Sequence, residues 1–142
     1  MRKIIAVTMI LVAGLLAVNA QEPTTPEAKP NKNAPVITFT ELVHDYGTIK
    51  QGSDGNFDFQ FKNSGKDPLI VNNVKSSCGC TVAEYTKDPV AKNKTGVVKV
   101  RYNTNNIGSF VKTVTIYSNA TNNPVVLTIK GTVEQAAQQQ AN

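Results

Sequence analysis

Residues 56–62, Asn-Phe-Asp-Phe-Gln-Phe-Lys, decide the fold class of this chain. Their three phenylalanines alternate strictly with polar side chains. Successive side chains of an extended strand point to opposite faces, so the three rings share one face. A strand with one apolar and one polar face is typical of an antiparallel sheet that covers a core on one side and meets water on the other. The stretch therefore predicts a β-strand on the surface of an apolar core.

Similar short segments lie on both sides of this strand, separated by turn-forming residues such as Ser64–Pro68. In the segment after that turn, we expect Ile70 and Val74 to face inward. Turn signals at intervals of about 8–12 residues, without a helical period, predict an all-β, immunoglobulin-like antiparallel β-sandwich of about seven strands. An open barrel is the alternative. The expected strands are residues 36–39, 56–62, 69–74, 81–85, 98–102, 110–116 and 125–133.

The length of 142 residues fits one domain with additional segments at both ends. Residues 1–20 have a basic start, an apolar middle and a small-residue ending, which is the pattern of a cleaved signal peptide. Residues 21–34 are rich in proline and charge and are expected to form a disordered linker. The sandwich domain is expected over residues 35–133, and residues 134–142 are expected to be a flexible tail.

The charge of the chain is moderate and spread out. It has 15 basic and 10 acidic side chains, a net charge of +5, and removal of the two basic residues in 1–20 would leave +3. A nucleic-acid-binding surface needs a basic face or stripe, which this distribution does not supply. The apolar run is shorter than the about 20 residues of a membrane span. We therefore expect an exported protein, periplasmic or secreted, with no nucleic-acid partner and no membrane span after signal cleavage.

The unusual cluster is Ser77-Cys78-Gly79-Cys80-Thr81, which contains both cysteines of the chain. In a straight strand the two Cα atoms would lie roughly 6.6 Å apart. A disulfide prefers about 5.5–6 Å, so a bond requires a bend, which Gly79 permits. Four interpretations are open: a local disulfide, two packed thiols, a redox-active pair and a Cu(I) site. The first two are favoured because paired cysteines of exported proteins are usually structural.

Metal and acid–base chemistry are disfavoured by the residue count. A structural zinc site takes four nitrogen or sulfur ligands, and the chain after residue 20 offers one histidine, two cysteines and no methionine. His44-Asp45-Tyr46 is a weak candidate site in the expected loop after the first strand, because general-base catalysis needs a positioned partner and a cleft. No catalytic residue, metal ligand or cofactor is predicted, and the protein is not expected to be an enzyme.

Several motifs occur together along the chain: His44-Asp45-Tyr46-Gly47, Phe57-x-Phe59-x-Phe61-x-Asn63-x-Gly65, Pro68-Leu69-x-Val71, Ser77-Cys78-Gly79-Cys80-Thr81, Gly108-Ser109-Phe110 and Leu127-x-Ile129-x-Gly131. Together they resemble a known bacterial family, the domain of unknown function 1573 family, over about residues 37–133. The resemblance implies an immunoglobulin-type sandwich similar to the major sperm protein and cilium-associated domains, in an exported protein. It implies no activity, and it carries over the cysteine pair only as a family signature.

These observations favour a non-catalytic binding or scaffold domain whose partner is a protein or another component of the cell envelope. Small sandwiches bind through end loops or by adding a strand to a free edge. The expected end loops are residues 43–52, 76–80 and 103–109, and the expected edge is the strand that follows Pro35. The alternative is a thiol-based redox or Cu(I)-binding protein that uses Cys78 and Cys80.

Overall fold

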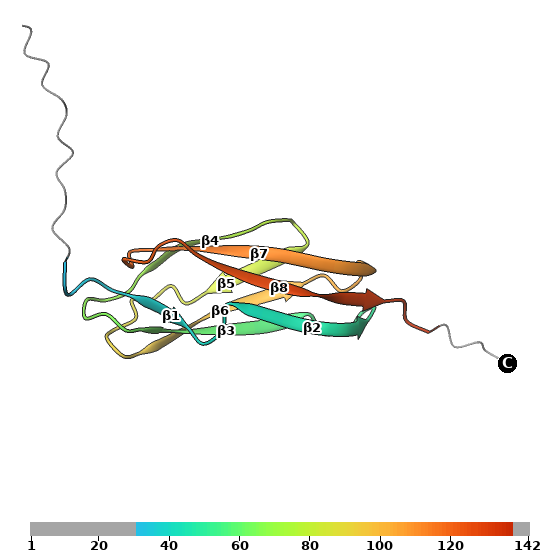
Figure 1. The fold of residues 1–142 in the computed structure, drawn as a ribbon, viewed down its shortest axis with the longest axis horizontal. Helices are drawn as coiled ribbons and strands as arrows, with labels where there is room; N and C mark the ends of the chain where they lie inside the picture. The colour runs from blue at the N-terminus through green and yellow to red at the C-terminus, as the bar shows by residue number, and fades with distance from the viewer. Residues whose placement is uncertain (1–30, 138–142) are drawn as a thin grey trace, which may run out of the picture. The chain divides into compact units, whose positions relative to one another are not determined.

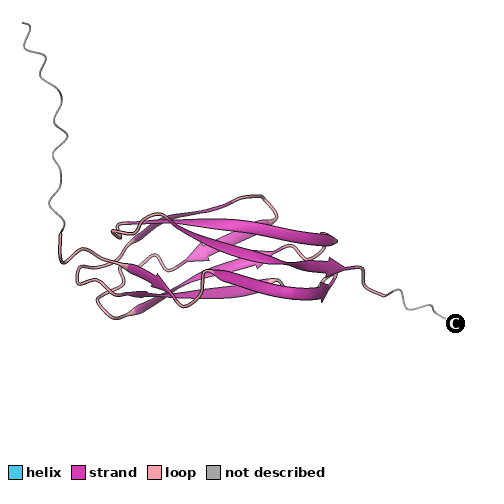
Figure 2. Cartoon of the chain, in the orientation of Figure 1, coloured by secondary structure: helices cyan, strands magenta, loops and turns pink. Residues whose placement is uncertain are grey.

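The fold consists of two packed β-sheets. A computed structural model of the chain describes residues 31–137, and it forms strands there and no helix (Figures 1 and 2). No helix in this range is long and apolar enough to cross a membrane. The predicted signal peptide lies outside the described residues. The strands are β1 (Ile37–Phe39), β2 (Val43–Lys50), β3 (Asn56–Asn63), β4 (Val71–Ser76), β5 (Thr81–Tyr85), β6 (Thr95–Tyr102), β7 (Gly108–Ser118) and β8 (Val125–Glu134).

The strands divide into two four-stranded sheets, which we call the first and the second sheet. The first sheet has the order β1-β3-β6-β5, and the second has the order β2-β8-β7-β4. Figure 1 shows the two layers lying against each other. This arrangement confirms the predicted immunoglobulin-like sandwich and excludes the open barrel for residues 31–137.

One pair of strands departs from the antiparallel prediction. β2 pairs with β8 in parallel, whereas the other neighbouring pairs are antiparallel. The chain runs along the first sheet as β1, crosses at residues 40–42 and continues in the second sheet as β2. The prediction of a loop over residues 43–52 is therefore wrong for Val43–Lys50. The alternation of this strand is broken by a register shift between Asp45 and Thr48, beside Gly47 at φ 62°.

The core lies between the two sheets and is built from the alternating positions that the sequence predicted. Each buried aliphatic or aromatic side chain of this kind contributes about 1.5–3 kcal/mol relative to an exposed one. Ile70 is an exception to the prediction, because it is 38% exposed while its neighbours Leu69 and Val71 are buried. The apolar side chains with at most 1% exposure are Phe59, Phe61, Leu69, Val98, Val100, Val114, Ile116, Leu127, Ile129 and Val133.

Two further motif residues, Asn63 and Gly65, hold the turn after β3. The Asn63 side chain is fully buried, and its amide donates to the carbonyls of Asp67 and Val90 at 2.8 and 2.9 Å. Its Oδ1 accepts the Gly65 N–H at 3.0 Å. A Cβ at Gly65 would lie 2.3 Å from the Ala34 carbonyl oxygen, so only glycine fits there. These residues have a structural role.

The sandwich also includes residues at both limits of the expected domain. Asn31 and Asn33, in the expected linker, bond to the turn at Asp67 through side chain and backbone. At the other end, β8 continues to Glu134, the first residue of the expected tail.

Candidate functional site

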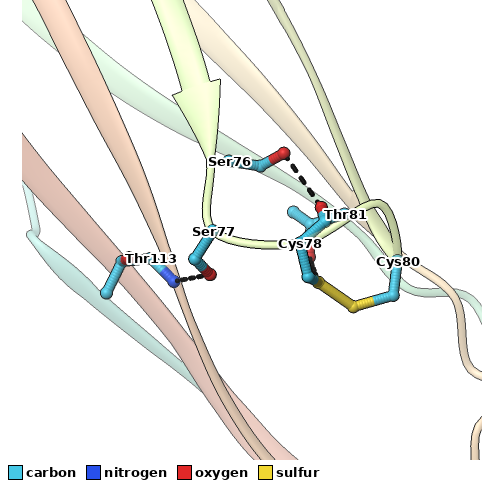
Figure 3. Close-up of a disulfide and its surroundings, with 6 residues drawn as sticks. All are labelled: Ser76, Ser77, Cys78, Cys80, Thr81 and Thr113. Carbon is cyan, nitrogen blue, oxygen red and sulfur yellow. Dashed lines mark hydrogen bonds between the residues drawn. A yellow bond between two sulfur atoms is a disulfide. The ribbon is translucent and has the colours of Figure 1, made fainter.

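The cysteine pair lies in the turn that carries the chain from the second sheet to the first, between β4 and β5. Cys78 and Cys80 are joined by a disulfide, with their Cα atoms 5.3 Å apart (Figure 3). That separation is shorter than in a straight strand, so the turn bends at Gly79 as the bond requires. Of the four open interpretations, the structure contains the local disulfide. A Cu(I) site would need two thiolates, which a disulfide does not supply.

Backbone hydrogen bonds fix the turn to a different sheet on each side. Ser77 continues the second sheet, because its N–H donates to the Thr113 carbonyl at 2.9 Å and its Oγ accepts the Thr113 N–H at 3.1 Å (Figure 3). Cys80 already belongs to the first sheet, because its carbonyl accepts the Asn103 N–H at 2.9 Å. The disulfide therefore spans the step from one sheet to the other.

Within the turn, the polar contacts converge on Cys78. Its carbonyl accepts the Ser76 hydroxyl at 3.1 Å and the Thr81 N–H at 3.4 Å. Its Sγ lies 3.8 Å from Oγ1 of Thr81, whose side chain is only 3% exposed. Gly79 forms the open tip, because a Cβ added there would meet no atom within 4 Å.

Two other turns meet the disulfide turn at this end of the sandwich. Residues 103–107 join the β2–β3 turn through the Thr104 hydroxyl, which donates to the Ser53 carbonyl at 2.6 Å. An open hollow of about 430 Å³ lies between the three turns, and Asp54, Cys80 and Arg101 are among its lining residues. The expected end loops 76–80 and 103–109 therefore come together here.

The His44-Asp45-Tyr46 candidate does not form an acid–base pair. These residues lie in β2, so His44 and Asp45 point to opposite faces. The His44 ring stacks on Phe57 with centroids 3.5 Å apart and meets the edge of Tyr46 at 4.6 Å. Asp45 instead accepts the Gly47 N–H at 2.8 Å and lies 3.4 Å from Lys130.

Two ionisable groups in β2 have shifted pKa values with clear causes. The Gly47 N–H lowers the pKa of Asp45, and Lys130 adds to this effect. Burial raises the pKa of Tyr46 to about 12, and the charge of Asp54 adds to this effect. The Tyr46 hydroxyl donates to the Gly55 carbonyl at 2.7 Å, which ties β2 to the turn beside the disulfide. Among residues 31–137, no group of three or more His, Cys, Asp or Glu side chains is arranged to hold a metal ion.

The edges of the sheets are the second candidate surface. β1 and β5 are the edges of the first sheet, and β2 and β4 are the edges of the second. An edge strand presents backbone N–H and C=O groups to which another extended segment can bond. Proteins protect such edges by short strands, bulges, lysines or covering side chains.

Three of these four edges carry such protection. β1, the edge expected from sequence, has three residues, and the Asn122 side chain bonds to both the N–H and the C=O of Ile37, at 3.2 and 2.8 Å. β2 has the register shift described above, and β4 has another between Val71 and Asn73. No sequence signal pointed to the role of Asn122.

The fourth edge, β5, pairs with β6 without a register shift over Thr81–Tyr85. Backbone hydrogen bonds join Thr86 to Val97 and Cys80 to Asn103, so the even-numbered residues of this segment direct their N–H and C=O groups to β6. In an antiparallel ladder every second residue directs its backbone groups to the partner strand, and the residues that alternate with them direct theirs to the opposite side. Ala83 and Tyr85 therefore present their N–H and C=O groups to the open edge.

The comparisons with known proteins agree with this fold. Residues 37–133 match the family described as protein of unknown function, DUF1573. The chain belongs to this family. No curated protein matches the chain. The family description names no activity, so the site has to be interpreted from its own geometry.

Several solved structures have a similar fold at low sequence identity. A protein of unknown function from Porphyromonas gingivalis W83 is 13% identical, with a TM-score of 0.64 and coverage of 76% of this chain and 51% of the other. This DUF1573 chain therefore spans about half the length of that protein. The ASH/PapD-like domain 7 of human CEP192 is 9% identical, with a TM-score of 0.62 and coverage of 92% and 100%. The secreted serine protease VesC of Vibrio cholerae is 15% identical, with a TM-score of 0.55 and coverage of 72% and 24%.

Proposed function

We propose that this DUF1573 chain is an exported, non-catalytic protein-binding domain that takes up an extended segment of its partner along the free edge of β5. The proposal rests on one observation: among the four sheet edges of residues 31–137, β5 lacks the bulges and covering side chains that protect the other three. Strand addition of this kind uses main-chain hydrogen bonds for affinity and alternate side chains for specificity.

The charges beside β5 favour a basic residue in the added segment. Asp58, Lys99 and Glu84 stand side by side on β3, β6 and β5, all exposed on the outer face of the first sheet. Opposite charges on neighbouring strands contribute about 0.2–1 kcal/mol per pair. The row alternates acidic, basic, acidic, so a lysine or arginine beside Glu84 continues the alternation.

The role as a binding domain is also supported by the site chemistry. His44 and Asp45 point to opposite faces, and His44 packs against aromatic rings. Export is supported by the leader pattern in residues 1–20 and by the disulfide, because such bonds persist in oxidising compartments. The partner is therefore expected in the cell envelope or outside the cell.

The proposal is tested with a displayed library of random seven-residue peptides, selected against the oxidised protein without residues 1–20. Selected peptides are then measured by calorimetry and by amide chemical shifts. We expect a lysine or arginine at one fixed position, with the largest shifts at Ala83 and Tyr85. Replacement of that basic residue by glutamate should weaken binding about 2–5-fold.

The matched variants are Ala83→Pro and Ala83→Ser. Ala83→Pro removes an N–H that faces the open edge and leaves the β6 ladder intact, so binding should fall about 2–10-fold or more while the fold is retained. Ala83→Ser keeps the N–H at the same position and serves as the control, with binding unchanged. Peptides that bind Ala83→Pro as tightly as the wild type, or that shift amides of β2 instead, would refute the proposal.

A further inference from the structure

We propose that the Cys78–Cys80 bond is a reversible thiol–disulfide exchange site for a dithiol protein, and that its reduction loosens the start of β5. The exchange itself is independent of the function proposed above. Only its consequence for peptide binding rests on that function.

The bond contributes little to holding the sandwich together. It joins residues two apart within one turn, and the entropy that a disulfide removes from the unfolded chain grows with the length of the closed loop. The buried apolar core is formed by other residues from both sheets, and Cys80 packs against it as a partly buried side chain. Both cysteines of the chain are in this bond, so no third thiol of the same chain competes in the exchange.

The disulfide turn is partly exposed at the end of the sandwich. Cys78 and Cys80 are each half-buried, and a Cβ at the tip residue Gly79 would meet no atom within 4 Å. Cys80 lines the open hollow together with Arg101 and Asp54. A guanidinium group at this place stabilises an approaching thiolate, and the Asp54 carboxylate opposes part of that effect. Exposed disulfides are the ones that exchange readily.

The two cysteines have different roles in the exchange. A thiolate of the dithiol protein attacks Sγ of Cys80, the Cys78–Cys80 bond breaks, and Cys78 leaves as a thiolate beside the Thr81 hydroxyl, which can donate a hydrogen bond to it. The second thiolate of the partner then attacks the mixed disulfide and releases Cys80. The partner is oxidised to a disulfide, and the two cysteines of this chain take up protons to become thiols.

Reduction affects the start of β5 because the turn leads directly into its first residue, Thr81. Thr81 donates to the Cys78 carbonyl at a long 3.4 Å, and in its sheet β5 pairs only with β6. Once the disulfide is reduced, the covalent ring that it closes no longer holds the Cys78 carbonyl in place. The start of the free edge should then exchange its amide hydrogens more readily, while strands in the centre of the sheets do not.

The test treats the folded protein with a reduced thioredoxin-type dithiol protein, traps thiols with an alkylating agent and measures the intact mass. We expect two alkylations, and their disappearance after treatment with oxidised glutathione. Hydrogen exchange of the amides of Thr81, Val82 and Glu84, which bond to the turn or to β6, should accelerate about 10-fold or more, while residues 57–63 keep their protection. A bond that resists the dithiol protein in the folded state would overturn the proposal, and so would general loss of protection on reduction.

Thr81→Val tests the role of the leaving sulfur. It removes the hydroxyl next to Cys78 at nearly constant volume and should slow reduction about 2–10-fold, whereas the control Thr115→Val, which is half-buried in β7, should leave the rate unchanged. Equal rates in both variants would overturn the assignment of Cys78 as leaving group. Because the peptide selection uses oxidised protein only, its failure leaves the exchange result interpretable, and the reverse also holds.

Discussion

The chain steps between the two sheets at β1–β2 and at β4–β5, and the two crossings are secured in different ways. Each has a backbone bond to one sheet and then to the other. Thr40 donates to Gln60 before the first crossing and Leu42 accepts from Thr128 after it, as Ser77 and Cys80 do at the second. The first crossing is packed by aromatic rings, and the second is closed by a disulfide.

The two crossings therefore contribute differently to the protein. The first stabilises the fold, whereas the second can change without disrupting it. At the first crossing, Phe39 packs on the core residue Phe61 with centroids 5.5 Å apart, and His44 stacks on Phe57. Such contacts cannot be released without exposing apolar surface. At the second crossing, one covalent bond and a few hydrogen bonds hold an exposed turn, so a chemical change there leaves the core intact.

The largest effect is expected from Phe61→Ala. Phe61 is 1% exposed, and truncation of a buried phenylalanine costs about 3–5 kcal/mol in the free energy of unfolding. Urea denaturation measures this loss. Val111→Ala, at a side chain that is 67% exposed, is the control and should change stability by less than about 0.5 kcal/mol. A loss below about 1 kcal/mol for Phe61→Ala would show that the first crossing does not carry the stability assigned to it.

A smaller effect is expected when the second crossing loses its bond. In Cys78→Ser with Cys80→Ser, the three-residue loop predicts a loss of about 1.6 kcal/mol from chain entropy, and the fold should persist. The double variant is compared with the oxidised wild type by urea denaturation and by hydrogen exchange of β3. If the variant fails to fold, the disulfide is as structural as the core, and the contrast between the two crossings disappears.

The sandwich could be predicted from sequence because its signal is local. The alternation at Phe57, Phe59 and Phe61 needs only the pleat of an extended chain, and the structure places the latter two at no more than 1% exposure. β2 was missed because its register shift at Asp45 breaks the alternation and its partner, β8, is more than 80 residues away.

The candidate site was only partly predictable for the same reason. The Ser-Cys-Gly-Cys-Thr cluster indicated a special turn, but whether the cysteines bond depends on the path of the turn. That path is set by Thr113 and Asn103, which lie in other parts of the sequence. The free edge at β5 follows from strand order, and the protection of β1 by Asn122 is a contact across 85 positions. The periodicity of a single segment contains no information about strand order or about contacts between distant residues.

The smallest predicted effect concerns Tyr46, which connects the two regions. Its ring packs against His44 near the aromatic crossing, and its hydroxyl donates to Gly55, which lines the hollow beside Cys80. Tyr46→Phe removes this hydrogen bond and should lower stability by about 0.5–1.5 kcal/mol at neutral pH.

The same variant should also alter the dependence of stability on alkaline pH. The pKa of Tyr46 rises from 10.0 to about 12 in the folded protein, so the unfolded chain releases this proton first. The corresponding stabilisation is complete below about pH 10 and is lost as the pH rises toward 12. Urea midpoints at pH 9 and pH 11 should therefore differ less in Tyr46→Phe than in the wild type. The control, Tyr117→Phe on the outer face of β7, should retain the wild-type difference, and an equal difference in all three proteins would mean that the Tyr46 hydroxyl does not link the crossings.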